Sequence, residues 1–241
     1  MTGTTPAAAT GVVGEIDRDR VLGLLADPPS VVVFSGPAGS GKSTVARQWT
    51  ARSKRSNVTV RVTAACDDPA ELARALVEAL EVIGPPADAT RARITAKEPA
   101  FSATLLPGLG RLAQTRSQPF ILVVDDAHLV TSDPAQQVLA VVCEGTPDGS
   151  TTALLSRSQT PAWLARLRTT GRLAEVTATD LAFDMHEAAE LLARLGAPVE
   201  PWIVADVVEH TEGWPVGVYL TGLSMRSGDV RLRQVEVDQG V

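Results

Sequence analysis

The 241-residue chain carries 22 lysine and arginine residues against 28 aspartate and glutamate residues, for a formal net charge of −6. Hydrophobic residues make up 44% of the chain, which is enough for a sizeable core. A domain that holds nucleic acid by its phosphates is usually basic, so the composition argues against DNA or RNA binding by this chain itself.

The first ten residues, Met1 to Thr10, lack the basic start and apolar stretch of a signal peptide, and we expect residues 1–10 to form a disordered tail. Cys66 and Cys143 show no CxxC spacing and are expected to be buried thiols in a reducing cytosol. No apolar run is long enough to span a bilayer. These features favour a cytoplasmic location without a membrane partner.

Short apolar or β-branched runs between turn residues predict five buried strands: Ser30–Ser35, Val58–Val62, Phe120–Asp125, Thr151–Ser156 and Leu173–Thr177. Helical patterns lie between them, at Lys42–Arg52, Pro69–Ile83, Leu105–Gln114, Ala135–Val142 and Trp163–Thr169. Strands that alternate with helices in this way indicate an α/β fold with a five-stranded parallel sheet, covered by helices on both faces.

After Thr177 no further strand is predicted. Asp184 and Glu187 form a capping box for a helix that ends near Leu195, and two further helices are expected to begin at Pro201 and Pro215. We therefore expect an α/β core over residues 11–179 and a small helical lid subdomain over 180–226. Residues 227–241 receive no assignment.

The strongest motif follows the first predicted strand and matches G-x-x-x-x-G-K-[ST] in full: Gly36, Pro37, Ala38, Gly39, Ser40, Gly41, Lys42 and Ser43. The glycines let successive backbone N–H groups turn toward phosphate oxygens, and the next helix adds its positive N-terminal end. Lys42 supplies a cation for the β- and γ-phosphates, the Ser43 hydroxyl is a ligand for Mg²⁺, and Thr44 is expected among the nucleotide contacts. The alternative is an ordinary glycine-rich turn with an incidental lysine.

A magnesium site is predicted where the strand Phe120–Asp125 ends in two acids. Ligands of an open parallel sheet bind beyond the carboxyl ends of its strands, so Asp125 is expected to hold Mg²⁺ through water beside the phosphate loop. Asp126 is a candidate for orienting or deprotonating the attacking water. Two solvated acids at a strand end are the simpler alternative. His128 is interpreted as a hydrogen-bonded structural residue.

Two further positions have the geometry to meet phosphate. Arg157 follows the fourth strand, where a guanidinium can reach a γ-phosphate, although a surface arginine is an equal alternative. Pro215 opens a helix after Gly213, which directs free N–H groups outward, although a plain turn between helices would look the same.

Taken together, these residues resemble the signal-transduction ATPases with numerous domains (the STAND class). More narrowly, they resemble the nucleotide-binding domain of the large ATP-binding LuxR-type transcriptional regulators, of which the bacterial maltose regulator is the familiar member. The similar segments are Arg18–Leu22, Gly36–Ser43 with Gln48 and Trp49, Asp125–His128, Leu155–Arg157 with Pro161 and Leu164–Arg168, and Glu212–Pro215.

The resemblance implies an AAA+-like core in which the sensor strand flanks the magnesium strand, together with a helical lid. It also implies that Arg18 and Arg20 lie near the nucleotide base and that Pro215 contacts the nucleotide. ADP would favour a closed resting state, ATP an open state able to self-associate, and slow hydrolysis would reset the switch. The DNA-binding helix-turn-helix of that family does not fit within 241 residues.

Three functions are compatible with these residues. The leading prediction is an ATP/ADP switch with slow, Mg²⁺-dependent hydrolysis. A P-loop kinase or a fast ATPase motor is the second, but the helices after Asp180 lack the arginine-rich run that a kinase lid usually carries. The third is a nucleotide-bound scaffold without hydrolysis, which the intact Lys42, Ser43, Asp125 and Asp126 disfavour.

Overall fold

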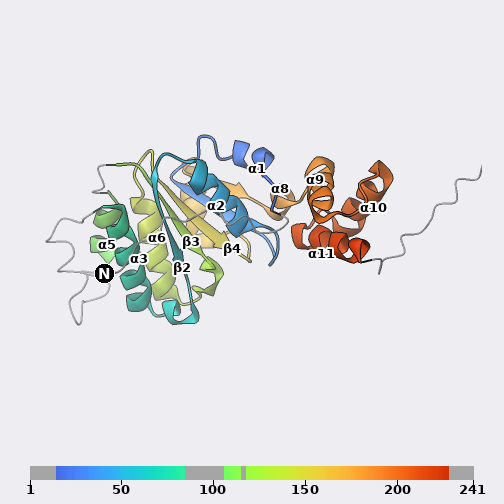
Figure 1. Ribbon diagram of the computed structural model, residues 1–241. Helices are drawn as coiled ribbons and strands as arrows, with labels where there is room; N and C mark the ends of the chain where they lie inside the picture. Colours follow the sequence, from blue (N-terminus) through green and yellow to red (C-terminus); the bar gives the residue numbers. More distant parts are fainter. Residues whose placement is uncertain (1–14, 85–105, 115–117, 228–241) are drawn as a thin grey trace, which may run out of the picture. The chain divides into compact units, whose positions relative to one another are not determined.

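The computed structural model describes residues 15–84, 106–114 and 118–227 (Figure 1). The expected tail over residues 1–10 and most of the unassigned stretch 227–241 lie outside these ranges, as does Leu105, the first residue expected for one helix. Contacts within the chain define two compact units. The sheet unit comprises the described residues within 19–181, and the helical unit combines residues 15–18 with residues 182–227.

The 19–181 unit is built on a parallel sheet of five strands in the order β2-β3-β4-β1-β5. The strands are β1 Val31–Ser35, β2 Ser56–Arg61, β3 Phe120–Asp125, β4 Thr151–Ser156 and β5 Leu173–Val176. This arrangement confirms the predicted α/β fold with a five-stranded parallel sheet. The predicted sensor strand β4 does lie beside the predicted magnesium strand β3.

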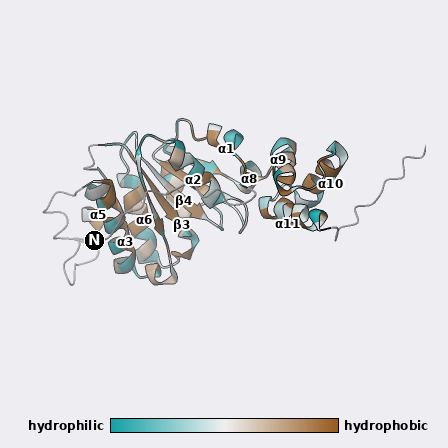
Figure 2. Cartoon of the chain, in the orientation of Figure 1, coloured by the Kyte–Doolittle hydropathy of each residue, from teal (hydrophilic) through white to brown (hydrophobic). Residues whose placement is uncertain are grey.

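Helices cover both faces of this sheet. Their bounds are α1 Asp19–Gly23, α2 Lys42–Arg52, α3 Pro69–Ile83, α5 Leu106–Gln114, α6 Asp133–Gly145, α7 Ala165–Thr169 and α8 Ala178–Leu181. One hydrophobic cluster joins a sheet face to α3, α5 and α6, and a second cluster joins the other face to α1 and α2. Figure 2 shows β3 and β4 in hydrophobic colours, as expected for central strands that are buried on both faces.

The second unit contains three helices, α9 Met185–Leu195, α10 Pro201–Thr211 and α11 Pro215–Arg226. The predicted capping box opens α9, because the Asp184 carboxylate accepts the Glu187 N–H and the Glu187 carboxylate accepts the Asp184 N–H. The core of this unit includes Ile16, which is 3% exposed. The segment before α1 therefore packs with helices α9 to α11, although these lie about 170 residues later in the chain.

The strand register brings the carboxyl ends of four strands together. Ser35 at the end of β1 pairs with Ser156 at the end of β4, and Arg61 at the end of β2 pairs with Asp125 at the end of β3. The residues that follow these ends therefore converge at one edge of the sheet, where the predicted site residues of β1, β3 and β4 meet.

Candidate functional site

The predicted phosphate loop connects β1 to α2 and has the backbone shape that its glycines predict. Gly39 and Gly41 have φ angles of 74° and 87°, a left-handed conformation that glycine adopts without strain. A Cβ on Gly36 would lie 3.0 Å from the Ser40 Oγ and 3.5 Å from the Ala178 Cα. The loop thus leads into α2 with its first N–H groups free of intrahelical partners, a suitable seat for phosphate.

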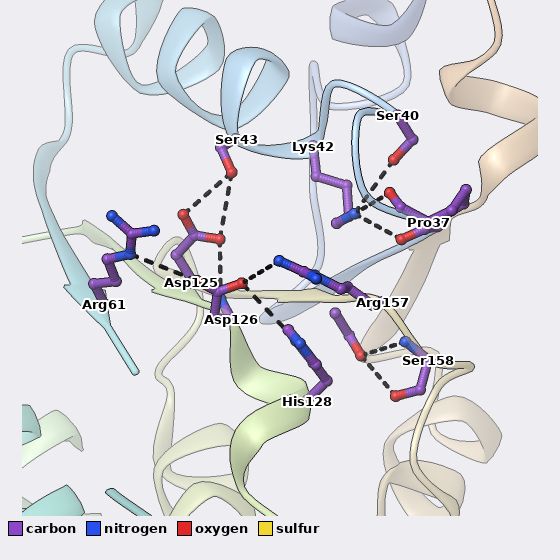
Figure 3. Close-up of polar contacts among 12 residues, drawn as sticks. Pro37, Ser40, Lys42, Ser43, Arg61, Asp125, Asp126, His128, Arg157 and Ser158 are labelled. Carbon is purple, nitrogen blue, oxygen red and sulfur yellow. Dashed lines mark hydrogen bonds and ion pairs between the residues drawn. The ribbon is translucent and has the colours of Figure 1, made fainter. Parts of the chain in front are cut away.

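Lys42 lies across the mouth of this loop (Figure 3). Its Nζ donates to the carbonyl oxygens of Gly36 at 2.6 Å and Pro37 at 2.8 Å, and lies 3.3 Å from the Ser40 Oγ. Partial burial lowers the pKa of Lys42, and the nearby Arg157 cation lowers it further, whereas Asp125 and Asp126 raise it. An anionic phosphate would stabilise the charged ammonium in this setting and would offer it stronger acceptors than backbone carbonyls.

Ser43 and Asp125 meet beside the loop, although they are far apart in the sequence. The Ser43 Oγ lies 3.3 Å and 3.1 Å from the two carboxylate oxygens of Asp125. A hydroxyl and a carboxylate are hard oxygen donors of the kind that Mg²⁺ prefers, and Mg²⁺ commonly takes its other ligands from water and phosphate. Within the described ranges no group of three or more His, Cys, Asp or Glu side chains is arranged to hold a metal ion, so Ser43 and Asp125 fit such a shared magnesium site rather than an all-protein cage.

Asp126 follows β3 in the left-handed conformation, with φ 58° and ψ 33°. Three basic side chains surround its carboxylate (Figure 3). The Arg61 Nε lies 3.5 Å from its Oδ2, and the Arg157 Nη2 and the His128 Nδ1 each lie 4.0 Å from its Oδ1. Asp126 therefore lies next to Asp125, with two arginines and a histidine around its carboxylate.

Sequence reasoning missed Arg61. Arg61 is the last residue of β2, directly opposite Asp125 in the sheet, so the strand register would have revealed it if the strand order had been known. His128 was expected to be hydrogen-bonded, and its buried Nδ1 has no hydrogen-bond partner among the described residues. The structural role of His128 stays a prediction.

The remaining predicted residues, Arg18, Arg20 and Pro215, make contacts of their own. Arg18 is 2% exposed, its Nε donates to the Glu187 Oε1 at 3.0 Å, and its guanidinium stacks 4.6 Å from the centre of the Phe183 ring. Its charge is thus committed to the helical unit. Arg20 belongs to the sheet unit, where its Nη2 donates to the Asp180 carbonyl at 3.0 Å. Pro215 is the first residue of α11 in the helical unit.

Comparison with known families now assigns the class. Residues 17–155 match the model of the AAA ATPase domain, and the chain belongs to this family of P-loop NTPases. Within it, the chain is similar to the HTH-type transcriptional regulator MalT of Serratia proteamaculans, at 29% identity over 221 residues. MalT of Yersinia pestis is also 29% identical, over 214 residues. These alignments cover 90% and 87% of this chain but 24% of each relative, so the chain spans about a quarter of their length.

Solved structures agree on the fold. A STAND protein with a tetratricopeptide repeat sensor from Pyrococcus horikoshii matches with a TM-score of 0.61 at 18% identity, covering 85% of this chain and 29% of that one. The Orc1 protein of Aeropyrum pernix, solved in complex with DNA, matches with a TM-score of 0.53 at 16% identity, covering 88% of this chain and 60% of that one. The predicted resemblance to STAND ATPases and MalT-like regulators is confirmed. Within the described ranges, no helix has the length and apolar character needed to cross a membrane.

Proposed function

We propose that this chain is a nucleotide-dependent switch module that binds ATP or ADP with Mg²⁺ and hydrolyses ATP slowly. The observation that carries the proposal is the contact of the Ser43 Oγ with both Asp125 carboxylate oxygens, at 3.1 and 3.3 Å, beside a complete phosphate loop. Two predicted metal ligands from different elements thus meet where a triphosphate would end.

Each residue has a distinct proposed role. Backbone N–H groups from Gly36 to Thr44 and the Lys42 ammonium bind the phosphates, and Ser43 and Asp125 hold Mg²⁺, which supplies charge neutralisation for the leaving phosphates. Asp126 orients the attacking water and accepts its proton. Arg157 stabilises charge on the γ-phosphate. Arg20 and Pro215 remain proposed nucleotide contacts.

The slow rate follows from the length of the proposed base. Aspartate is one methylene shorter than the glutamate that many P-loop ATPases use, which places its carboxylate farther from a water in line with the γ-phosphate. Arg61 and Arg157 also lie beside the Asp126 carboxylate, so they compete with the attacking water for its oxygens. The Asp126 carboxylate must leave these contacts before it can act as a base in each turnover. Slow turnover of this kind suits a switch better than a motor.

The likeness to MalT supports a regulatory setting. We propose that the chain acts as the ATPase domain of a transcriptional regulator, with the sheet unit as its core and the helical unit as its lid. In this proposal the bound nucleotide decides between a resting state and a self-associating state. Binding to DNA would be the task of segments that the MalT relatives possess beyond the quarter of their length that this chain matches.

The nucleotide content of the purified chain tests the proposal, measured by acid release and chromatography and followed by single-turnover hydrolysis. Tightly bound ADP and slow turnover are expected. An empty site with many turnovers per second would favour a fast ATPase or a kinase, which phosphate transfer to candidate acceptors would then distinguish. Bound ATP that is never hydrolysed would favour the scaffold.

Two variants separate binding from chemistry. Lys42→Ala should abolish tight triphosphate binding, whereas Asp126→Asn should retain ATP and slow hydrolysis by about a hundredfold or more, the usual contribution of a general base. Asparagine is the right replacement because it tolerates the left-handed backbone of position 126. Unchanged ATP affinity in the first variant contradicts the phosphate-loop assignment, and unchanged turnover in the second removes Asp126 as the base.

A further inference from the structure

A second pocket adjoins the proposed nucleotide site without sharing its main residues. Its volume is about 260 Å³, and it is enclosed by the end of β4, the turn after β3, the start of α6 and the segment 158–163. Among the described residues that line it, none comes from the phosphate loop, and Asp125, Asp126 and Arg157 are absent. Nothing in the proposed ATPase mechanism uses this space.

The walls of the pocket are uncharged apart from one histidine. Leu154, Pro161 and Trp163 supply apolar surface, and serine, threonine and glutamine side chains supply hydrogen-bonding groups, while no Lys, Arg, Asp or Glu is found among its described lining residues. Burial of an unpaired charge is costly, so phosphates and carboxylates do not suit these walls. A neutral molecule with an apolar body and a polar group at its edge does.

The hydrogen-bonding groups are held in place at one side of the pocket. The Ser156 and Ser158 hydroxyls lie 2.9 Å apart, and the Ser158 N–H donates to the Ser156 Oγ at 3.1 Å. Each hydroxyl offers one donor and two acceptor positions, so this pair keeps capacity for another partner. These two serines flank Arg157, and their positions therefore set the turn from which that guanidinium approaches Asp126.

His128 connects the pocket to the proposed active site. Its ring lines the pocket, and its Nδ1 lies 4.0 Å from the Asp126 Oδ1, where it is buried without a hydrogen-bond partner among the described residues. In Figure 3 a ring nitrogen of His128 faces Asp126. An occupant of the pocket would touch the same ring, so it could press that nitrogen toward the carboxylate or draw it away.

We propose that this pocket binds a compact, neutral molecule with a flat apolar body and a hydroxyl or amide group, and that its occupant changes the rate of ATP hydrolysis through His128 and the Ser156–Ser158 turn. The volume is just below the usual range for ligand sites, which suits a molecule of one or two rings and excludes a nucleotide. The regulatory half of the proposal rests on the proposed ATPase function, whereas the binding half does not.

Fluorine NMR with 4-fluorophenol tests the binding half on the full chain. The phenol should show saturable line broadening, fluorobenzene should bind more weakly because it lacks the hydroxyl, and 4-fluorobenzoate should not bind because it is charged. The absence of saturable broadening by the phenol overturns the site. Equal broadening of all three probes overturns its selectivity for neutral hydrogen-bonding molecules.

Variants locate the binding. Ser158→Phe, which fills the pocket from its polar side, should weaken 4-fluorophenol binding by about tenfold, which corresponds to roughly 1.4 kcal/mol of binding free energy. If its thermal unfolding loses cooperativity, Gln159→Trp repeats the test from an exposed position. Lys42→Ala, the matched control in the phosphate loop, should bind the phenol as the unmodified chain does. Unchanged affinity in the folded pocket variants, or loss in Lys42→Ala, overturns the location.

Single-turnover ATP hydrolysis with saturating 4-fluorophenol tests the regulatory half. A rate change of about fivefold is expected in the unmodified chain, within the usual range of allosteric coupling, and none is expected in Ser158→Phe. An unchanged rate despite demonstrated phenol binding overturns the regulatory half. If the chain hydrolyses no ATP at all, the proposed ATPase function fails, and the NMR titration still decides the binding half.

Discussion

Asp126 shows how single side chains set the chemistry of this site. Its left-handed backbone turns the carboxylate toward three basic groups, and the shortest approach, 3.5 Å, is to Arg61 at the end of the neighbouring strand. Arg61 is 80% exposed, so water and salt screen this pair and its contribution to stability is small. The main effect of Arg61 is on the Asp126 carboxylate, because the guanidinium contacts an oxygen that could otherwise bind the attacking water.

We predict that Arg61→Gln speeds ATP hydrolysis, because the Asp126 carboxylate loses a competing contact and is freer to orient the attacking water. Exposed ion pairs contribute about 0.2–1 kcal/mol, so the expected gain is about 1.4-fold to fivefold, and it should shrink at high salt. Single-turnover hydrolysis at two ionic strengths measures it. Arg74→Gln is the control, since Arg74 pairs with Glu71 on α3. A slower Arg61→Gln enzyme would mean that Arg61 helps the reaction.

At the scale of elements, the sequence predicts helix ends best where a capping residue, a glycine or a proline marks them. The bounds of α2 and α3 agree with the predicted ranges, α10 begins at the predicted Pro201, and Asp68 caps α3 just before a proline in its first turn. The short helices α1 and α8 were not predicted. Helices of four or five residues are too short to be stable alone, and these two are held by tertiary contacts such as that between Arg20 and the Asp180 carbonyl.

Helix α6 extends beyond both predicted ends, and strand β2 begins two residues before its predicted start but stops at Arg61, one residue short of Val62. The structure begins α6 at Asp133, because Pro134 is acceptable in a first turn, and ends it at Gly145 rather than Val142. Strand β2 begins at Ser56, where polar residues continue the ladder with β3. Hydrophobic patterns identify the buried middle of an element, while backbone pairing with neighbours decides where it stops.

Two glycines with similar backbone conformations yield a prediction: Gly213 lies between α10 and α11, and Gly196 lies between α9 and α10. Gly213 has φ 68°, and a Cβ there would lie 2.4 Å from the Phe183 carbonyl oxygen. Gly196 has φ 72°, but its Cβ would meet only the Arg226 Cδ, at 4.0 Å. Gly196→Ala should cost about 1 kcal/mol of unfolding free energy, from backbone strain alone, and Gly213→Ala at least about 3 kcal/mol.

Urea unfolding of both variants, followed by the circular dichroism of the helices, checks this difference. Equal destabilisation would mean that the chain relieves the Phe183 contact by a small backbone shift. Because both glycines have a left-handed backbone, that conformation cannot explain a difference in stability between the two variants.

A second element-scale prediction concerns Asp67, which ties the segment after β2 to the start of α6. Its Oδ1 accepts the Ser132 N–H at 2.7 Å and the Thr131 N–H at 2.6 Å, and these backbone hydrogen bonds lower the pKa of Asp67, with the Ser132 bond first in importance. A lowered folded-state pKa means that the contribution is complete above the unfolded value of 3.8 and is lost as the pH falls through the lower folded value.

Asp67→Asn should therefore lower the urea midpoint at pH 7 and pH 5, and the difference from the unmodified chain should narrow below about pH 4. Asp68→Asn is a useful comparison, because that side chain caps α3 rather than joining two segments. A difference that stays constant from pH 7 to pH 3 would show that the Asp67 charge is not what stabilises the contact.

At the scale of the whole molecule, the order of the strands is the feature that local patterns left open. Five strands and their parallel direction follow from the alternation with helices, but that alternation does not place β4 between β3 and β1; only the family resemblance implied that the two strands adjoin. This order separates the phosphate-loop strand from the magnesium strand by one strand, and it puts Arg157 between them. The sheet unit therefore assembled as the resemblance predicted, while the packing of Arg18 in the helical unit was unforeseen.

The placement of Arg18 gives a prediction for the whole chain. A version that begins at Asp19 loses the buried Ile16 and the ion pair of Arg18 with the 4% exposed Glu187, and removal of one partner of a buried ion pair is strongly destabilising. Hydrogen exchange should then quicken in α9–α11 and stay unchanged in the sheet. A chain that begins at Glu15 is the matched control. Faster exchange in the sheet instead would contradict the assignment of residues 15–18 to the helical unit.

Because the chain passes between its two units twice, after Arg18 and after Leu181, the helical unit is connected to the sheet unit through both of its ends in sequence. A protease that cuts only after Leu181 would produce two fragments and yet not free the helices. The larger fragment would still hold them through Ile16 and the ion pair between Arg18 and Glu187. The nicked protein would migrate as one species on a size-exclusion column and as two fragments on a denaturing gel. Cleavage at this junction would therefore not be detected by size under native conditions.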